Sequence, residues 1–114
     1  MADFDANIVI IGAGVVGLAL ARELSEKSIE VLLLEELSKF GQVTSSRNSG
    51  VIHAGIYYPE NSLKAKMCLE GNTLLYQYCN TYSIPHRNTK KLLVASSNEQ
   101  VKIIDNIKIQ AEKN

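Results

Sequence analysis

The stretch that decides the fold is Gly12-Ala13-Gly14-Val15-Val16-Gly17, which matches the pattern G-x-G-x-x-G. It lies between an apolar, β-branched run over 6–11 and a run over 15–26 whose apolar residues recur at helical spacing. A second apolar run follows over 30–34. Strand, glycine turn, helix and strand within residues 6–35 predict a βαβ unit, with two parallel strands buried on both faces and a right-handed crossover.

The glycine pattern predicts a seat for the diphosphate of a dinucleotide. Gly12 allows a tight turn, Gly14 lets the backbone approach a phosphate, and Gly17 lets the helix pack close to the strand. The helix N-terminus then directs free N–H groups and a positive dipole end at the phosphates. Glu35, with Glu36 beside it, ends the second strand, and its carboxylate suits ribose hydroxyls but repels the 2′-phosphate of NADP. The alternative is a glycine turn without a ligand and a surface glutamate.

One position departs from the usual form of this pattern. Ser28 stands at the end of the helix, where glycine is more common. If the backbone there is left-handed, serine costs on the order of 1 kcal/mol. Such a cost is tolerable and leaves the phosphate contacts unchanged.

A long loop and a helix follow the βαβ unit. The loop over 37–55 is rich in Ser, Thr, Gly and Asn, and loops of this length are usually functional or disordered. A helix is predicted over 62–82, with Ser62 as its N-cap. Its buried stripe is predicted to comprise Met67, Leu74, Leu75, Tyr78 and Tyr82.

The last third of the chain predicts one strand and one helix. The strand is expected over 91–95 and the helix over 98–112. Ser96 and Glu99 match a capping box, Ser-x-x-Glu, at the start of that helix. The whole chain, 1–114, is then interpreted as one partial domain.

Composition excludes several functions. Twelve basic and twelve acidic residues give a net charge of zero, which argues against a nucleic-acid surface. Cys68 and Cys79 stand about 16 Å apart along the predicted helix, too far for a disulfide, and are interpreted as small buried thiols in a reducing compartment. Asp3 and Asp5 stand where a secretory signal would carry positive charge, so a cytoplasmic location is predicted.

The segment after the second strand carries a more specific signal. Residues 44–58 read Thr-Ser-Ser-Arg-Asn-Ser-Gly-Val-Ile-His-Ala-Gly-Ile-Tyr-Tyr. This run resembles the corresponding segment of the D-amino-acid-oxidase-like flavoproteins, and within them most resembles the L-2-hydroxyglutarate dehydrogenase/oxidase group. Ser62-Leu63-Lys64-Ala65-Lys66 and Glu70-Gly71-Asn72 are similar to that group too. The resemblance covers 7–95 and implies an α/β fold: the incomplete N-terminal part of a Rossmann-like, glutathione-reductase-type FAD-binding domain.

The resemblance also implies roles for individual residues. His53 falls where the chain passes near the flavin ring, packing against it or bonding to it, with catalysis or a covalent bond to FAD as alternatives. Tyr57 and Tyr58 either line the site or pack in the core. Small and hydroxylic residues would flank the diphosphate and ribityl chain of FAD, and the matching residues are Thr44, Ser45, Ser46, Arg47, Asn48 and Ser49.

The implied reaction converts a 2-hydroxy acid into a 2-oxo acid, with a hydride passing to the flavin and a proton to a base. Electrons would leave for oxygen or for a membrane quinone, which makes the inner-membrane surface an alternative location for the full-length protein. Only two strands of the cofactor sheet are expected here. We therefore expect the chain to be marginally stable, to bind FAD weakly or not at all, and not to turn over substrate alone. Its implied partners are the small hydroxy acid and a separately encoded remainder of the enzyme.

Three alternatives remain open at this point. A sister flavoprotein would oxidise glycerol 3-phosphate, sarcosine or an amino acid. An NAD-dependent Rossmann dehydrogenase would continue with another short helix and strand soon after Glu35, whereas this chain enters a hydroxylic loop. A non-catalytic remnant would carry the motif without its use.

Overall fold

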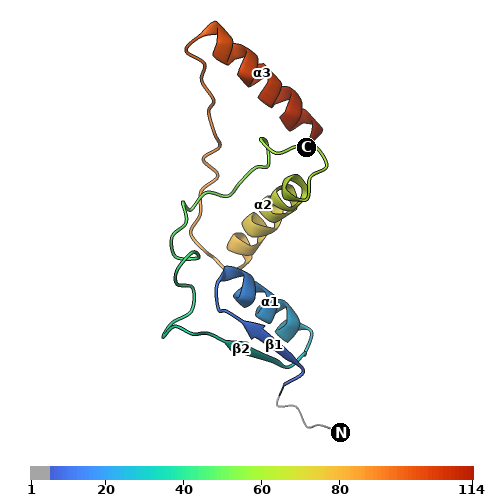
Figure 1. Cartoon of the computed structure of the whole chain (residues 1–114), viewed down its shortest axis with the longest axis vertical. Coiled ribbons are helices and arrows are strands. Elements are labelled where there is room, and N and C mark those ends of the chain that lie inside the picture. The colour runs from blue at the N-terminus through green and yellow to red at the C-terminus, as the bar shows by residue number, and fades with distance from the viewer. Residues whose placement is uncertain (1–5) are drawn as a thin grey trace. The chain divides into compact units, whose positions relative to one another are not determined.

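The computed structural model describes residues 6–114, and it divides the chain into two compact units (Figure 1). The first is Met1–Gly50, of which 6–50 are described, and the second is Val51–Asn114. The expectation that rests on Asp3 and Asp5 lies outside the described residues. Each unit has its own internal contacts and is described separately.

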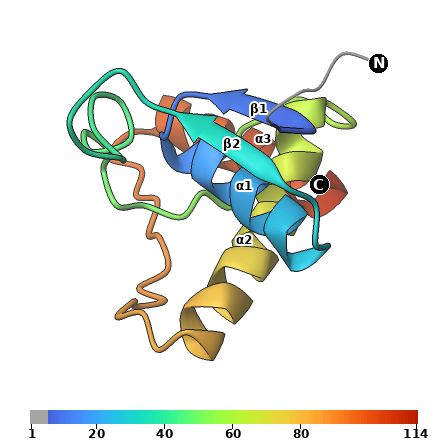
Figure 2. The same ribbon diagram turned by 90° about the horizontal axis from the view of Figure 1, so that it is seen from below.

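The first unit is a βαβ arrangement. Strand β1 (Ile8–Ile11) leads into helix α1 (Val15–Glu26), and strand β2 (Val31–Leu34) follows. The two strands are parallel, with Ile8 opposite Val31 and Ile11 opposite Leu34. Figure 2 shows α1 against one face of the pair. The predicted strand–turn–helix–strand order and the parallel pairing are therefore confirmed.

Only one face of this strand pair is covered. Ile10 is buried beneath α1, whereas Val9 and Ile11 on the same strand are exposed. The expectation of strands buried on both faces is wrong for the described residues. A single helix can cover one face of a pair, and the side chains that alternate to the other face stay in solvent.

The C-terminal end of α1 has the left-handed residue that was anticipated. Ser28 has a φ of 57°. Its N–H donates to Ser25 O at 2.9 Å, and the N–H of Ile29 donates to Leu24 O at 3.0 Å. These bonds satisfy carbonyls that the last helical turn leaves free, which offsets part of the strain of a left-handed serine.

The second unit begins with a loop segment and helix α2 (Leu63–Thr81). Ser62 is the N-cap, and its Oγ accepts from the N–H of Ala65 at 3.1 Å, as predicted. The predicted buried stripe is wrong, because Met67, Leu74, Leu75 and Tyr82 are exposed and Tyr78 is half-buried. The residues of α2 that are buried are the small ones, Ala65 and Cys79.

Helix α3 (Asn98–Lys113) ends the chain. Its N-cap is Ser97, whose Oγ accepts from the N–H of Gln100 at 3.3 Å, so the predicted capping box at Ser96 and Glu99 is displaced by one residue. Ser97-x-x-Gln100 fits the same rule, and the Gln100 side chain accepts from the N–H of Ser96 at 2.8 Å.

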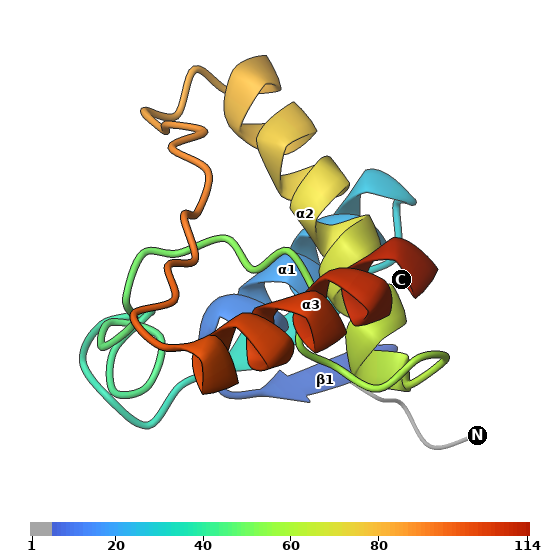
Figure 3. The same ribbon diagram turned by 90° about the horizontal axis from the view of Figure 1, so that it is seen from above.

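The strand expected over 91–95 is not formed. The connection between α2 and α3 is irregular, as Figure 3 shows, and Leu92 and Val94 within it are exposed. A strand needs a neighbour to accept its backbone hydrogen bonds, and residues 91–95 have no paired strand in the described chain.

No helix among residues 6–114 is long and apolar enough to cross a membrane. The same residues contain no gathering of three or more potential metal-binding side chains. Cys68 and Cys79 are both free thiols; Cys79 is buried and Cys68 is partly exposed.

Candidate functional site: a glycine turn faced by a carboxylate

The glycine turn between β1 and α1 is the centre of the first unit. Gly12 has a φ of 99°, a left-handed conformation that favours glycine, and its N–H donates to Leu34 O at 2.7 Å. A Cβ at Gly17 would lie 2.0 Å from Gly12 O and 3.4 Å from the Ile10 side chain. Gly17 is therefore required for α1 to approach the turn and β1 this closely.

The carboxylate of Glu35 faces this turn. Its Oε2 accepts from the N–H of Ala13 at 2.7 Å, across 22 residues of sequence. Its Oε1 accepts from the N–H of Leu37 at 3.0 Å. The N–H groups of Leu37 and then Ala13 hold the pKa of Glu35 below its usual range. The end of β2 thus presents an ionised acceptor to the glycine turn.

The loop after β2 also contacts the turn, through Ser45. The Ser45 hydroxyl oxygen accepts from the N–H of Val15, the first residue of α1, at 2.9 Å across 30 residues. A Cβ at Gly14 would lie 3.0 Å from that oxygen. The N–H of Gly41 donates to Ala13 O at 2.8 Å. The loop is therefore fastened to the turn at two points.

The other hydroxylic and amide residues of the loop stabilise the loop itself. Ser46 Oγ donates to Val43 O at 2.9 Å. Asn48 Nδ2 donates to Ser45 O at 2.8 Å, and its Oδ1 accepts from the N–H of Gly50 at 2.8 Å. Predicted site residues with exposed side chains, not brought to the turn by these contacts, are Glu36, Thr44, Arg47 and Ser49.

His53 belongs to the second unit, and its side chain is exposed. Its backbone carbonyl accepts from Asn72 Nδ2 at 3.1 Å. The amide of Asn114 donates to the carbonyls of Gly55 and Tyr58, each at 3.0 Å. The segment that carries His53 is therefore held along α2 and by the last residue of the chain.

The tyrosines of that segment each lie beneath a lysine. Lys64 Nζ lies 4.3 Å from the centre of the Tyr58 ring, and Lys91 Nζ lies 4.8 Å from that of Tyr57. Cation–π contacts of this kind stabilise a surface arrangement. They give both rings a structural role within the second unit.

Four residues that hold the loop after β2 and the 53–58 segment in place were not predicted from the sequence. Leu37 and Gly41 act through backbone N–H groups, which no side-chain pattern reveals. Gly41 has a φ of 69°. A glycine in a turn after Phe40 is the feature of the sequence from which its role could have been predicted. Asn72 in α2 and Asn114, which follows α3, act through side-chain amides.

The turn has the chemistry that an adenine-dinucleotide cofactor requires. Glycine at 12, 14 and 17 keeps side chains away from the start of α1, and a Cβ at Gly14 would press on the Ser45 hydroxyl. Backbone N–H groups and a hydroxyl suit phosphate oxygens, and an ionised carboxylate suits ribose hydroxyls. The residues present fit FAD.

Comparison with known proteins agrees with this geometry. The family model described as FAD dependent oxidoreductase matches residues 7–114. A protein of Arabidopsis thaliana named mitochondrial L-2-hydroxyglutarate dehydrogenase is 61% identical over 99 residues, which are 87% of this chain and 20% of the relative. Proteins of the same name from Nematostella vectensis and Homo sapiens are 41% identical over 95% of this chain and 44% identical over 83% of it.

These relatives are much longer than the matched region. The chain spans 24% of the Nematostella protein and 21% of the human one. The match covers almost every residue from the first strand to the end of the last helix. The chain therefore belongs to the FAD-dependent oxidoreductase family, and FAD is its cofactor.

Proposed function

We propose that the first unit holds the adenosine diphosphate half of FAD in an enzyme that oxidises an L-2-hydroxy acid to a 2-oxo acid. The observation that carries the proposal is the contact between Glu35 Oε2 and the N–H of Ala13. This contact supports the proposal because it brings a carboxylate, which suits ribose hydroxyls, to the turn where the diphosphate would lie. The proposal includes the glutathione-reductase-type Rossmann fold, of which the βαβ unit is the first part.

The proposed contacts divide between the turn and the loop. The diphosphate would lie over the N-terminus of α1, against residues 12–17, with the Ser45 hydroxyl as a donor to a phosphate oxygen. Because the Ser45 oxygen already accepts from Val15, its own proton is free to point toward an anion. Residues that would approach FAD from the loop when it is bound are Glu36, Thr44, Ser46, Arg47, Asn48 and Ser49.

FAD supplies the acceptor for the hydride of the substrate. The chain's own residues bind and orient that cofactor: the turn fixes the diphosphate, and Glu35 fixes the ribose. We place His53 near the flavin end, where it packs against the ring or donates a hydrogen bond to it. A role for His53 as the base is the second choice, since its exposed side chain has no orienting partner among the contacts described above.

The names of the relatives favour L-2-hydroxyglutarate as the substrate over glycerol 3-phosphate, sarcosine or an amino acid. The same names favour a mitochondrial compartment over the cytoplasm. Association with the inner membrane surface remains part of the proposal for the full-length protein. If this chain is made as a separate polypeptide, we propose that its partner is the separately encoded remainder of the enzyme.

The test is an NMR titration of the ¹⁵N-labelled 114-residue chain with ADP, FAD and FMN. We expect ADP and FAD to shift the amide signals of Ala13, Val15 and Leu37 even at millimolar affinity. FMN, which lacks the adenosine, should leave Ala13 and Leu37 unshifted. Equal shifts with FMN, or no shifts of these amides with ADP, would overturn the proposal.

A variant pair tests the role assigned to Glu35. Glu35→Gln removes the charged acceptor, so we expect it to weaken ADP binding several-fold. Glu36→Gln makes the same change of charge on the neighbouring exposed residue, which makes no contact with the turn, and should weaken ADP binding less than Glu35→Gln does. Equal weakening in both variants would show that net charge, rather than the carboxylate at the turn, determines binding.

The isolated chain should not turn over substrate. It spans about a quarter or less of the length of the three relatives described above. We expect purified chain to lack stoichiometric flavin absorbance and to leave L-2-hydroxyglutarate unchanged. A yellow preparation that oxidises L-2-hydroxyglutarate would contradict this expectation.

A further inference from the structure

Ser45 reaches the glycine turn from an irregular part of the first unit. Its hydroxyl oxygen accepts from the N–H of Val15 at 2.9 Å, across 30 residues of sequence. A Cβ at Gly14 would lie 3.0 Å from the same oxygen, so the hydroxyl lies close against the backbone of the turn. Residues 35–50 form no helix or strand. The position of Ser45 therefore depends on contacts that the loop itself makes.

Asn48 makes such a contact with each end of its side-chain amide. Its Nδ2 donates to the backbone carbonyl of Ser45 at 2.8 Å. Its Oδ1 accepts from the N–H of Gly50 at 2.8 Å. Asparagine closes turns by side-chain bonds of this kind, and here the two bonds join the chain before Asn48 to the chain after it.

The bond from Asn48 differs from the neighbouring bonds of the loop because it acts on Ser45 directly. Ser46 Oγ donates to Val43 O at 2.9 Å, so the Ser46 hydroxyl holds a different residue. Within residues 6–114, Asn48 is the residue that bonds to the backbone of Ser45. The hydroxyl of Ser45 is thus fixed at α1 on one side, and its backbone is fixed by Asn48 on the other.

We propose that Asn48 is a positioning residue for the cofactor site. By holding the backbone of Ser45, it keeps the Ser45 hydroxyl at the N-terminus of α1, where the diphosphate of FAD would lie. A group held in place before the ligand arrives binds it more tightly than one that must first be ordered. The inference rests on the proposed function and refines it, because Asn48 acts through Ser45 and not by a bond of its own to the cofactor.

The experiment is a double-mutant cycle on the full 114-residue chain, with ADP binding measured by NMR titration. We expect Asn48→Ala to weaken ADP binding about threefold, because the Ser45 hydroxyl then spends less time at the turn. In a Ser45→Ala background the same change should weaken binding by less than about 1.5-fold, since the group that Asn48 positions is absent. Asn88→Ala removes an exposed amide from the second unit and should bind ADP as the parent does.

Hydrogen exchange of the Val15 amide, measured without ADP, is a second readout. Asn48→Ala should speed this exchange, because Ser45 protects Val15. The amide of Ala13 bonds to a different residue and should keep its protection. Asn48→Asp retains the acceptor for Gly50 but loses the donor to Ser45, so it should also speed the exchange of Val15.

Each outcome decides the proposal. Coupling between the two substitutions, together with faster exchange of Val15, supports it. Losses that multiply in the double variant overturn it, because Asn48 would then contact the nucleotide independently of Ser45. Parent-like ADP affinity or unchanged Val15 exchange in Asn48→Ala also overturns it. If ADP shifts no amide of the parent chain, the proposed function fails instead, and the exchange of Val15 still decides whether Asn48 positions Ser45.

Discussion

The long-range hydrogen bonds of the two units satisfy different backbone groups, N–H groups in the first and carbonyls in the second. In the first unit, contacts converge on the glycine turn, where a carboxylate and a hydroxyl accept from the N–H groups of Ala13 and Val15. In the second unit, the amides of Asn72 and Asn114 donate to carbonyls of the 53–58 segment. The first pattern leaves a hydroxyl beside a helix N-terminus, which suits a diphosphate, and a carboxylate, which suits ribose hydroxyls. The second pattern holds the 53–58 segment in its conformation.

The largest expected effect comes from filling the space at Gly17. Gly17→Ala puts a Cβ 2.0 Å from Gly12 O, and backbone cannot yield as a flexible side chain can. We expect the first unit to lose about 3 kcal/mol or more of stability. Hydrogen exchange should show faster exchange across residues 8–34, with α2 unchanged.

The second unit offers a matched control for that variant. Gly71 lies inside α2, and a Cβ there would meet nothing within 4 Å. Gly71→Ala should therefore stabilise α2 by about 1 kcal/mol, because alanine is the better helix former. Destabilisation in both variants would show that the close approach at Gly17 is not the cause.

The next effect separates two neighbouring serines of the loop. Ser45→Ala removes the acceptor for the N–H of Val15, and loss of a helix cap costs about 1 kcal/mol. We expect ADP to bind about fivefold more weakly to this variant, measured by NMR titration. Ser46→Ala should weaken ADP binding less than Ser45→Ala does, because the Ser46 hydroxyl donates to Val43 O within the loop. An equal loss of ADP affinity in both variants would show that the contact between Ser45 and Val15 has no particular role in binding.

The sequence was sufficient to predict the βαβ unit because its signals are local. The glycine turn, the helical spacing after it and two apolar runs predict elements whose pairing follows from chain topology. The site residues were predicted only as a group, without the contact that each one makes. Thr44, Ser45 and Ser46 have the same chemistry in one run, and only the fold shows that the Ser45 hydroxyl reaches α1.

The failures in the second unit have two physical causes. The large apolar residues of α2 were predicted from hydropathy, but the packed side contains small ones: a Cβ at Gly55 would lie 3.4 Å from the Ala65 carbonyl oxygen and 3.5 Å from Cys68 Cβ. Small residues admit a close backbone without adding to hydropathy. The expected strand over 91–95 is apolar after Lys91, but strand formation depends on a neighbour that the composition of a segment cannot supply.

A pH-dependent effect tests the carboxylate that distinguishes the first unit. The N–H groups of Leu37 and Ala13 lower the pKa of Glu35 from its usual value of 4.5. A carboxyl whose pKa is lower in the folded chain stabilises the fold above its unfolded pKa, and this contribution disappears as the pH falls through the folded pKa. Urea unfolding at a series of pH values should therefore show a shallower acid decline for Glu35→Gln. Some decline should remain, because the pKa of Glu23 is also lowered, chiefly by its hydrogen bond to Lys27.

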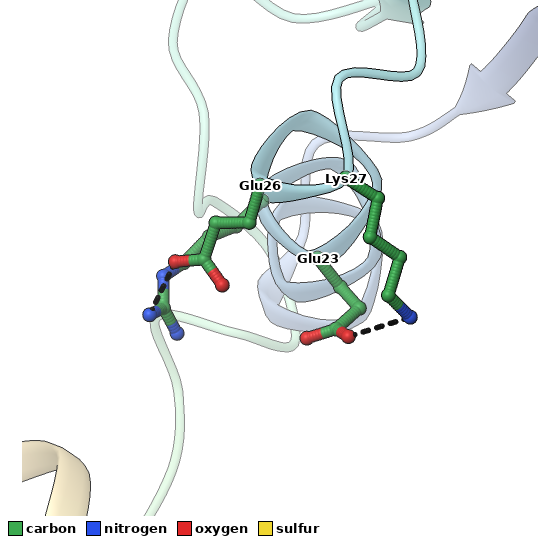
Figure 4. A network of polar contacts seen from close by, with 4 residues as sticks. Glu23, Glu26 and Lys27 are labelled. Carbon is green, nitrogen blue, oxygen red and sulfur yellow. Dashed lines mark ion pairs between the residues drawn. The ribbon is translucent and has the colours of Figure 1, made fainter.

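The smallest expected effect comes from the exposed side of α1, which faces neither the sheet nor the turn. Two ion pairs join successive turns there, Glu23 to Lys27 at 2.8 Å and Arg22 to Glu26 at 2.6 Å (Figure 4). Exposed pairs of this spacing contribute little, because solvent screens them and both side chains lose freedom when they meet. Lys27→Ala should lower the unfolding midpoint only slightly at low salt and not at all at high salt. ADP binding should be unchanged, since the pair lies at the opposite end of α1 from the glycine turn. A loss of ADP affinity in Lys27→Ala would mean that the charge of the helix surface, and not the glycine turn with the Ser45 hydroxyl, attracts the diphosphate.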